Sequence, residues 1–388
     1  MRPAVPTRVW TATLALVAAG AGAQVAACVS TAPFAEGAPT VDGGGAPPEA
    51  SPPETGPAPE QDAAVADANC TSTQSDPLNC GTCGRSCLGG GCEAGVCLPV
   101  TIASGLVSPG SLALDDASVY FAENGKTLWR MDKDGGGMSM LATEPSQLGA
   151  VTVSDTEVYW TGSGNAGNVR RASKVDGGGP QVLASNQGSL LLQIALDATH
   201  AYYGSRGAST IMRVALSGTL PPETLISADL GPTAVAVDAT YFYWTTVDTV
   251  GTAGKVSARR KDLSAAAVDL VTGISVPGTM TIDANSVYWT DYKEGTVRGI
   301  GKPGIGAGIT FAMNQSGANG ISVDAEYVYW GAFVGEAVSR SLKSAATPQP
   351  LALAQTPITS LANDGCCIYW TARGSGSSPD GRVVKLVK

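Results

Sequence analysis

The sequence predicts an all-β fold, a seven-bladed β-propeller over residues 98–388. Seven motifs of an apolar residue, a tyrosine and a further aromatic residue recur there, with 39 to 45 residues between successive tyrosines. That period is the length of one four-stranded propeller blade. The composition agrees, because 49 glycines, 24 prolines and only 15% charged residues favour short strands and turns over amphipathic helices. The motifs are Val119-Tyr120-Phe121, Val158-Tyr159-Trp160, Ala201-Tyr202-Tyr203, Phe242-Tyr243-Trp244, Val287-Tyr288-Trp289, Val328-Tyr329-Trp330 and Ile368-Tyr369-Trp370.

The N-terminal segment, residues 1–27, is predicted to be a signal peptide. Two arginines precede an apolar stretch at 9–18 that is too short to span a membrane. Residues 21–23 (Ala-Gly-Ala) fit a cleavage site, whereas residues 25–28 resemble a bacterial lipobox, which would make Cys28 a lipid-bearing first residue. The cysteine count favours lipidation, since the other eight cysteines can pair among themselves.

Residues 28–69 are predicted to be a disordered tether. They are rich in Pro, Ala, Gly and acidic residues and contain almost no large apolar side chains. Such a segment cannot bury enough surface to offset the entropy lost on ordering. Behind an anchor, it would hold a folded domain away from a membrane.

Residues 70–97 are predicted to form a small disulfide-stapled module, because they contain too few apolar residues for a core. The spacing Cys80-x2-Cys83 also suits zinc, but an exported thiol cluster is usually oxidised. The pattern over 76–87 resembles small cysteine-rich modules that recur in predicted surface proteins of myxobacteria and their relatives. The sequence leaves the pairing open. The six cysteines are Cys70, Cys80, Cys83, Cys87, Cys92 and Cys97.

Within the repeats, a small-residue strand suited to the crowded axis precedes an Asp in six of the seven units, and unit two has Ser154 there. We expect each Asp to hold a tight turn by accepting backbone N–H groups. A ring of carboxylates that binds a cation is the alternative. The third strand carries a basic residue with a packed stem. The aspartates are Asp115, Asp197, Asp238, Asp283, Asp324 and Asp364, and the basic residues are Arg130, Arg171, Arg213, Arg259, Arg298, Arg340 and Lys385.

The strand count predicts how the ring closes. Residues 100–104 form a fourth strand with no blade before it, and residues 382–388 form a third strand with no fourth strand after it. The leading strand, six complete blades of four strands and the three strands of the last unit give 28 strands. The first strand is therefore expected to complete the last blade, which removes an exposed edge.

The segment Tyr288-Trp289-Thr290-Asp291 is a full match to the repeat signature of the YWTD propellers, the class B repeats of the LDL-receptor family, and Val297-Arg298 follows at a similar distance. The resemblance covers all seven units, although the other units carry only part of the signature and that family has six blades. It implies a propeller whose repeat residues hold the blades together and whose partners bind on loops.

Two further features concern cysteine and histidine. Cys366 and Cys367 occupy the turn of the last unit, where a vicinal disulfide is expected and two free or separately paired thiols are the alternative. His200 is the only histidine and stands in the corresponding turn of unit three, which leaves no supply for a histidine metal centre.

The expected function is that of an exported binding or scaffold protein, at the cell envelope or outside the cell, with a protein or glycan partner. The net charge of −9 disfavours nucleic acid, and no Gly-rich loop opens a helix to hold a nucleotide. We predict no cofactor, no metal and no catalytic residue. Exposed aromatic and arginine side chains are the usual anchors of interfaces. On the face shared by the loops after the second and fourth strands they are Arg206, Tyr292, Lys293, Phe333 and Arg373.

Two other hypotheses stay open. One is a propeller hydrolase or lyase, lactonase-like, with a divalent ion in the central channel, although the inner strands offer mainly Ala, Ser, Thr and Val, with Gln193 and Asn363 as exceptions. The other is a structural spacer, which would have no saturable ligand.

Overall fold

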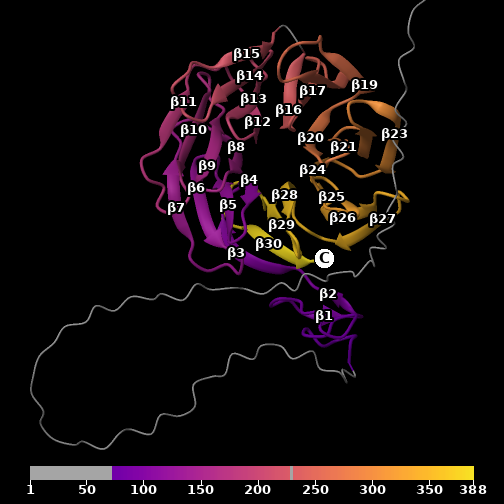
Figure 1. Cartoon of the computed structure of the whole chain (residues 1–388). Helices are drawn as coiled ribbons and strands as arrows, with labels where there is room; N and C mark the ends of the chain where they lie inside the picture. Colours follow the sequence, from indigo (N-terminus) through magenta and orange to yellow (C-terminus); the bar gives the residue numbers. More distant parts are fainter. Residues whose placement is uncertain (1–71, 228–229) are drawn as a thin grey trace, which may run out of the picture. The chain divides into compact units, whose positions relative to one another are not determined.

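The computed structural model describes residues 72–227 and 230–388. In these ranges the chain folds into β-strands that form seven four-stranded antiparallel sheets arranged in a ring, which confirms the predicted propeller (Figure 1). A further two-stranded hairpin lies in the cysteine-rich segment. The described residues include no helix that could cross a membrane. The predicted signal peptide, Cys28, the tether and Cys70 lie outside the described residues.

Six of the seven blades run outward from the axis in chain order, and the last blade takes its outer strand from the start of the domain. The innermost strands are β4 (Pro109–Leu114), β8 (Leu148–Val153), β12 (Leu191–Leu196), β16 (Gly231–Val237), β20 (Pro277–Ile282), β24 (Ala318–Val323) and β28 (Ile358–Asn363). The second strands are β5 (Ser118–Glu123), β9 (Glu157–Gly162), β13 (His200–Ser205), β17 (Tyr241–Val247), β21 (Ser286–Asp291), β25 (Tyr327–Ala332) and β29 (Cys367–Ala372). The third strands are β6 (Thr127–Asp132), β10 (Asn168–Ser173), β14 (Thr210–Ala215), β18 (Gly254–Arg260), β22 (Thr296–Gly301), β26 (Ala337–Leu342) and β30 (Gly381–Val387). The outer strands are β7 (Ser139–Thr143), β11 (Gln181–Ala184), β15 (Glu223–Ile226), β19 (Val268–Ile274), β23 (Ile305–Ala312), β27 (Pro348–Ala352) and, from the start of the domain, β3 (Val100–Leu106).

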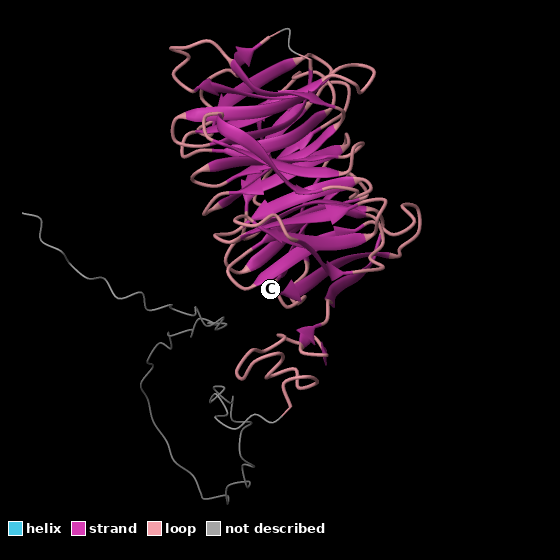
Figure 2. Cartoon of the chain, turned by 90° about the vertical axis from the view of Figure 1, so that its right-hand side faces the viewer, coloured by secondary structure: helices cyan, strands magenta, loops and turns pink. Residues whose placement is uncertain are grey.

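The ring closes as the strand count predicts. The last sheet has the order β28-β29-β30-β3, so the first strand of the domain is the outer strand of the final blade. Thr101 lies opposite Val384 and Ser104 lies opposite Arg382 in the antiparallel register. Figure 2 shows the domain from the side, with the strands of neighbouring blades stacked. This pairing leaves no blade of the ring incomplete.

The core lies between the blades, where the aromatic motifs of the second strands are buried on both faces. Trp160, for example, is fully buried and belongs to a cluster that also holds Tyr120 and Leu128 of the preceding blade. A segment covered on both faces is expected to consist of aliphatic and aromatic residues, as these three-residue motifs do. The fully buried tryptophans are Trp160, Trp289, Trp330 and Trp370, with Trp244 exposed by 1%.

The recurring aspartates hold the turns, as predicted, and also join neighbouring blades. In all six copies one carboxylate oxygen, Oδ1, accepts the backbone N–H groups two and three residues later. The other oxygen, Oδ2, lies 2.6 to 3.0 Å from the Nζ of a lysine that directly follows the third strand of the next blade. The same lysines lie 5.0 to 6.0 Å from the ring centre of the repeat tyrosine. The pairs are Asp115–Lys174, Asp197–Lys261, Asp238–Lys302, Asp283–Lys343, Asp324–Lys388 and Asp364–Lys133.

This ring of ion pairs replaces the alternative of carboxylates that bind a cation, because the carboxylates already hold lysines. In five of the six turns the tyrosine hydroxyl also donates to the same oxygen, at 2.7 to 3.0 Å. The sequence argument missed the lysines, although their fixed place after the third strand was a visible signal. The pairs are partly buried, so solvent and salt screen them less than they screen exposed surface pairs.

The ring is interrupted once, between the second and third blades, where both partners differ together. Ser154 stands in place of the aspartate and Leu216 in place of the lysine. Glu157 fills part of the gap, since its Oε2 accepts the Tyr159 hydroxyl at 2.7 Å and lies 3.0 Å from Arg171 Nη1. Arg171 in turn donates to the Leu216 carbonyl at 2.8 Å.

We expect the double variant Ser154→Asp/Leu216→Lys to complete the ring of inter-blade ion pairs. The new pair should show a favourable coupling energy of about 1 kcal/mol, whereas Leu216→Lys alone should destabilise the protein because it removes a partly buried apolar side chain. Urea denaturation of both single variants, the double variant and the wild type measures this coupling. Strictly additive effects would contradict it.

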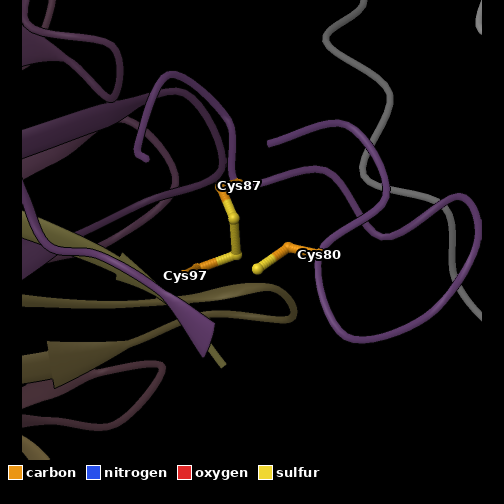
Figure 3. A group of neighbouring side chains, drawn as sticks. All are labelled: Cys80, Cys87 and Cys97. Atoms are coloured by element: carbon orange, nitrogen blue, oxygen red, sulfur yellow. A yellow bond between two sulfur atoms is a disulfide. The ribbon is translucent and has the colours of Figure 1, made fainter. Parts of the chain in front are cut away.

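The cysteine-rich segment is stapled as predicted. Disulfides join Cys80 to Cys92 and Cys87 to Cys97, and Cys83 is also disulfide-bonded, so these sulfurs are not available as zinc ligands. The hairpin of β1 (Cys92–Glu93) and β2 (Val96–Cys97) carries two of these residues. Figure 3 shows the Cys87–Cys97 bond with the Cys80 sulfur beside it.

The stapled segment packs on the last blade. Its cysteines Cys80, Cys87 and Cys97 belong to one hydrophobic cluster with Leu386 of β30, and Val387 packs against that cluster. Arg85 adds a hydrogen bond from its Nη2 to the Lys388 carbonyl at 2.8 Å. The module therefore contacts the strand against which β3 closes the ring.

Candidate functional site

The loops after the second strands lie on one face together with the connections between blades, as predicted. Four of the five candidate residues occupy one equivalent position, directly after the second strand. Their backbone N–H groups donate to carbonyls of the connection that enters the same blade, at 2.8 to 3.2 Å. The four are Arg206, Tyr292, Phe333 and Arg373, with acceptors Leu190, Val276, Gly317 and Pro357. This face, defined by these positions and their loops, is called the loop face below.

Because these four residues occupy the same position in four different blades, their side chains are spread around the axis and do not all come together. The rings of Tyr292 and Phe333 lie 6.3 Å apart, and Tyr292 is 36% exposed. Arg373 instead donates from Nε to Ser108 Oγ at 2.9 Å. Lys293 reaches the adjoining loop, where its Nζ lies 3.4 Å from the Gly251 carbonyl.

Two exposed valines lie on loops of the same face, and sequence reasoning missed both. Val334 directly follows Phe333 and is 58% exposed, and Val250, in the adjoining loop of the fourth blade, is 73% exposed. Single apolar residues in loops carry no pattern, so the sequence offered no signal for them. Their exposure on loops next to an aromatic pair extends the apolar part of the loop face.

A central cavity of about 720 Å³ runs along the innermost strands of all seven blades. Arg206 and Tyr292 are among its lining residues, which places these two candidates at its loop-face mouth. Apart from the Arg206 guanidinium, its polar lining is made of hydroxyl and amide groups, and among the described residues that line it there is no carboxylate and no histidine. The hydroxyl and amide side chains besides Tyr292 are Ser111, Thr152, Gln193, Thr233, Thr279, Asn319, Thr359 and Ser360.

Gln193 spans part of this cavity. Its Nε2 donates to the Met280 carbonyl at 3.0 Å, a contact between the third and fifth blades. Its Oε1 and the Thr279 hydroxyl are buried without a hydrogen-bond partner among the described residues. Such groups need water or a polar ligand to be satisfied. Asn363, the other polar exception of the inner strands, instead hydrogen-bonds Ser322.

A second cavity, of about 520 Å³, lies between the fourth and fifth blades. Its lining includes Asp238 and Lys302, which form one of the inter-blade ion pairs at 3.0 Å. Because these charged groups already satisfy each other, the cavity offers little that would hold a charged ligand.

The aspartate of the YWTD match has a structural role. Asp291 is only 3% exposed. Its carboxylate accepts the N–H groups of Ser275, Val276, Lys293 and Glu294 at 2.9 to 3.2 Å. It thereby fastens the connection between blades to the loop that presents Tyr292.

The single histidine is the first residue of β13, at the end of the turn that follows an inner strand, and it does not line the central cavity. His200 Nδ1 is 2.8 Å from Thr199 Oγ1, and its backbone N–H donates to Asp197. At the equivalent turn of the last blade, the sulfurs of Cys366 and Cys367 lie 2.7 Å apart. Both observations agree with turn roles for these residues.

Comparison with known proteins supports the fold alone. The sequence matches no protein-family model, and a search of curated proteins found no match. The structure of virginiamycin B lyase from Staphylococcus aureus is similar, with a TM-score of 0.60 and 13% identity over 75% of this chain and 98% of that one. A nidogen–laminin complex matches with a TM-score of 0.50 and 18% identity, over 60% of this chain and 92% of that one. The designed protein Ika8 matches with a TM-score of 0.54 and 16% identity, over 74% and 98% of the two chains.

Proposed function

We propose that this chain is an exported binding or scaffold protein that holds a protein or glycan partner on its loop face. The observation that carries the proposal is the pairing of the Tyr292 and Phe333 rings. Tyr292 also lies at the mouth of the central cavity, which Arg206 lines as well. Rigid aromatic rings with a nearby arginine supply contact area and directed hydrogen bonds at little entropic cost. The nidogen–laminin structure shows that a propeller of this kind occurs in a protein complex.

Export is supported by the disulfides of the cysteine-rich segment, since such bonds persist in oxidising compartments. Lipid attachment at Cys28, after removal of residues 1–27, would tether the propeller to a membrane. The segment 28–69 would then set its reach. This arrangement suits a module that is displayed at the cell envelope.

The lyase alternative finds less support in the residues of the central cavity. One of the similar structures is a catalytically inactive His-to-Ala variant of virginiamycin B lyase with quinupristin. In this chain the only histidine lies outside the cavity, and the described lining residues are neutral apart from Arg206. General acid–base chemistry and ion binding both need groups that this lining does not supply.

We expect the variant Tyr292→Ala/Phe333→Ala to weaken partner binding by about thirtyfold, because hot-spot aromatics contribute about 2 kcal/mol or more. The measurement is saturation binding of the full chain to an array of defined glycans and to fractionated envelope proteins. Val175→Ala is the matched control, since that side chain is 80% exposed and lies in the hairpin between β10 and β11.

Equal urea-denaturation curves for all three proteins would establish that the loss is local. A partner that binds the double variant as tightly as the wild type would place the interface elsewhere. The absence of any saturable partner would favour the spacer hypothesis.

A further inference from the structure

The turn that ends in β29 brings two thiols together by a geometry that is common to the blades. Asp364 Oδ1 accepts the N–H groups of Cys366 and Cys367 at 3.0 and 2.8 Å. In the third blade the same two positions are Thr199 and His200, whose side chains are also in contact, at 2.8 Å. The turn itself therefore places neighbouring side chains side by side, and in the last blade both of them carry sulfur.

The two sulfurs differ in access and in reactivity. Their separation is 2.7 Å, so little movement is needed to reach the bonding distance of about 2.05 Å. Cys366 is partly exposed and Cys367 is buried. The hydrogen bond with Cys366 lowers the pKa of the Cys367 thiol against the opposing effect of burial. The buried sulfur thus has increased thiolate character next to an accessible partner.

This turn also connects four parts of the molecule. Asp364 Oδ2 binds Lys133 of the first blade at 2.7 Å. The Cys366 carbonyl accepts the N–H of Lys388 at 3.0 Å, and Lys388 in turn holds Asp324 of the sixth blade and Arg85 of the cysteine-rich module. A covalent change at residues 366–367 therefore acts where the blade that closes the ring meets its neighbours.

We propose that Cys366 and Cys367 form a reversible vicinal disulfide, a redox-sensitive modification site on the face opposite the loop face. The oxidant is a small-molecule disulfide of the glutathione class. The Cys366 thiolate attacks one sulfur of this external disulfide, which gives a mixed disulfide and releases one small-molecule thiolate. The Cys367 thiolate then attacks Cys366 Sγ and releases the second small-molecule thiolate. The two cysteine protons pass to the two thiolates released, and the external disulfide takes up the two electrons.

The redox state of this pair can be measured in one tryptic peptide. Trypsin is expected to release residues 344–373 as a single peptide in which Cys366 and Cys367 are the only cysteines. The full chain is equilibrated with oxidised or with reduced glutathione, quenched in acid, denatured with an alkylating agent and digested. After oxidation we expect this peptide to lack alkyl groups and to weigh two hydrogen atoms less than the unmodified peptide. After reduction we expect two alkyl groups. The state of the module's disulfides does not affect this readout.

The variant Cys366→Ser is the control and is expected to lose the oxidised form, with Cys367 either alkylated or carrying glutathione. Two alkyl groups on the wild-type peptide after oxidation would overturn the proposal, as would a cross-link from this peptide to another. Stoichiometric zinc released on denaturation, with both thiols alkylated, would also overturn it, because Asp364 and the two sulfurs are close enough to hold an ion.

Discussion

Between about pH 4 and pH 2, we expect the propeller to lose on the order of 5 kcal/mol of its free energy of unfolding, about 1 kcal/mol for each aspartate of the inter-blade ring. Burial alone would raise the pKa values of these carboxyl groups. The lysine of the next blade, the tyrosine hydroxyl and the turn amides outweigh it, and they lower the pKa of Asp115, Asp283 and Asp324 to about 2. The lysine and the turn amides also outweigh burial and lower the pKa values of Asp197, Asp238 and Asp364, and the tyrosine hydroxyl contributes at Asp197 and Asp238.

The direction of this effect follows from proton linkage. Because the folded-state pKa values lie below the ordinary aspartate pKa of about 3.9, the unfolded chain binds protons first as the pH falls. The stabilisation is therefore complete above about pH 5 and is lost as the pH falls through the folded-state values. Urea denaturation at a series of pH values from 7 to 2 measures it.

A pair of variants distinguishes the ring from surface charges. Asp197→Asn/Lys261→Met removes one inter-blade pair and should make the loss of stability in acid smaller. Asp262→Asn removes an exposed pair with Arg260 and should leave the pH dependence nearly unchanged, since solvent screens that pair. A pH dependence that is equal in both variants and the wild type would contradict the role of the ring.

Replacing Asp291 with alanine is expected to lower the free energy of unfolding by about 3 to 4 kcal/mol. The carboxylate is buried and accepts four backbone N–H groups, which alanine would leave without a partner. An unsatisfied buried donor costs about 1 to 3 kcal/mol, although water would reach some of these four.

Asp248→Ala is the matched control for this prediction. Asp248 also accepts a backbone N–H group in a loop of the same face, from Thr252 at 2.7 Å, but in an exposed setting. We expect its replacement to cost less than about 1.5 kcal/mol. Urea denaturation at pH 7 compares the two variants. Equal losses would show that burial of Asp291 is not the cause.

The Asp291→Ala substitution also tests whether the Tyr288–Asp291 motif supports partner binding on the loop face. If Asp291 fastens the loop that presents Tyr292, the Asp291→Ala variant should also bind the partner of the loop face more weakly, even where it remains folded. Retained affinity in a destabilised protein would instead limit the motif to holding blades together.

The sequence by itself determined the repeat, the number of blades and the closure of the ring. These features rest on short-range patterns: an apolar-Tyr-aromatic strand that must be covered on both faces, and a count that leaves 100–104 and 382–388 as each other's partners. Disulfide stapling of the module followed in the same way, from six cysteines in a segment without a core. Each of these depends on what a residue type must do locally to be buried or paired.

Only the tertiary structure decided which distant side chains meet. Asp364 pairs with Lys133 across 231 residues, and Gln193 reaches Met280 across 87, because the ring brings the first blade to the last and the inner strands to one axis. Of the predicted loop-face residues, Tyr292 and Phe333 came together, while Arg373 turned to Ser108. The direction of a side chain depends on the curvature of the closed ring and on neighbouring loops. The repeat pattern in the sequence contains no information about either.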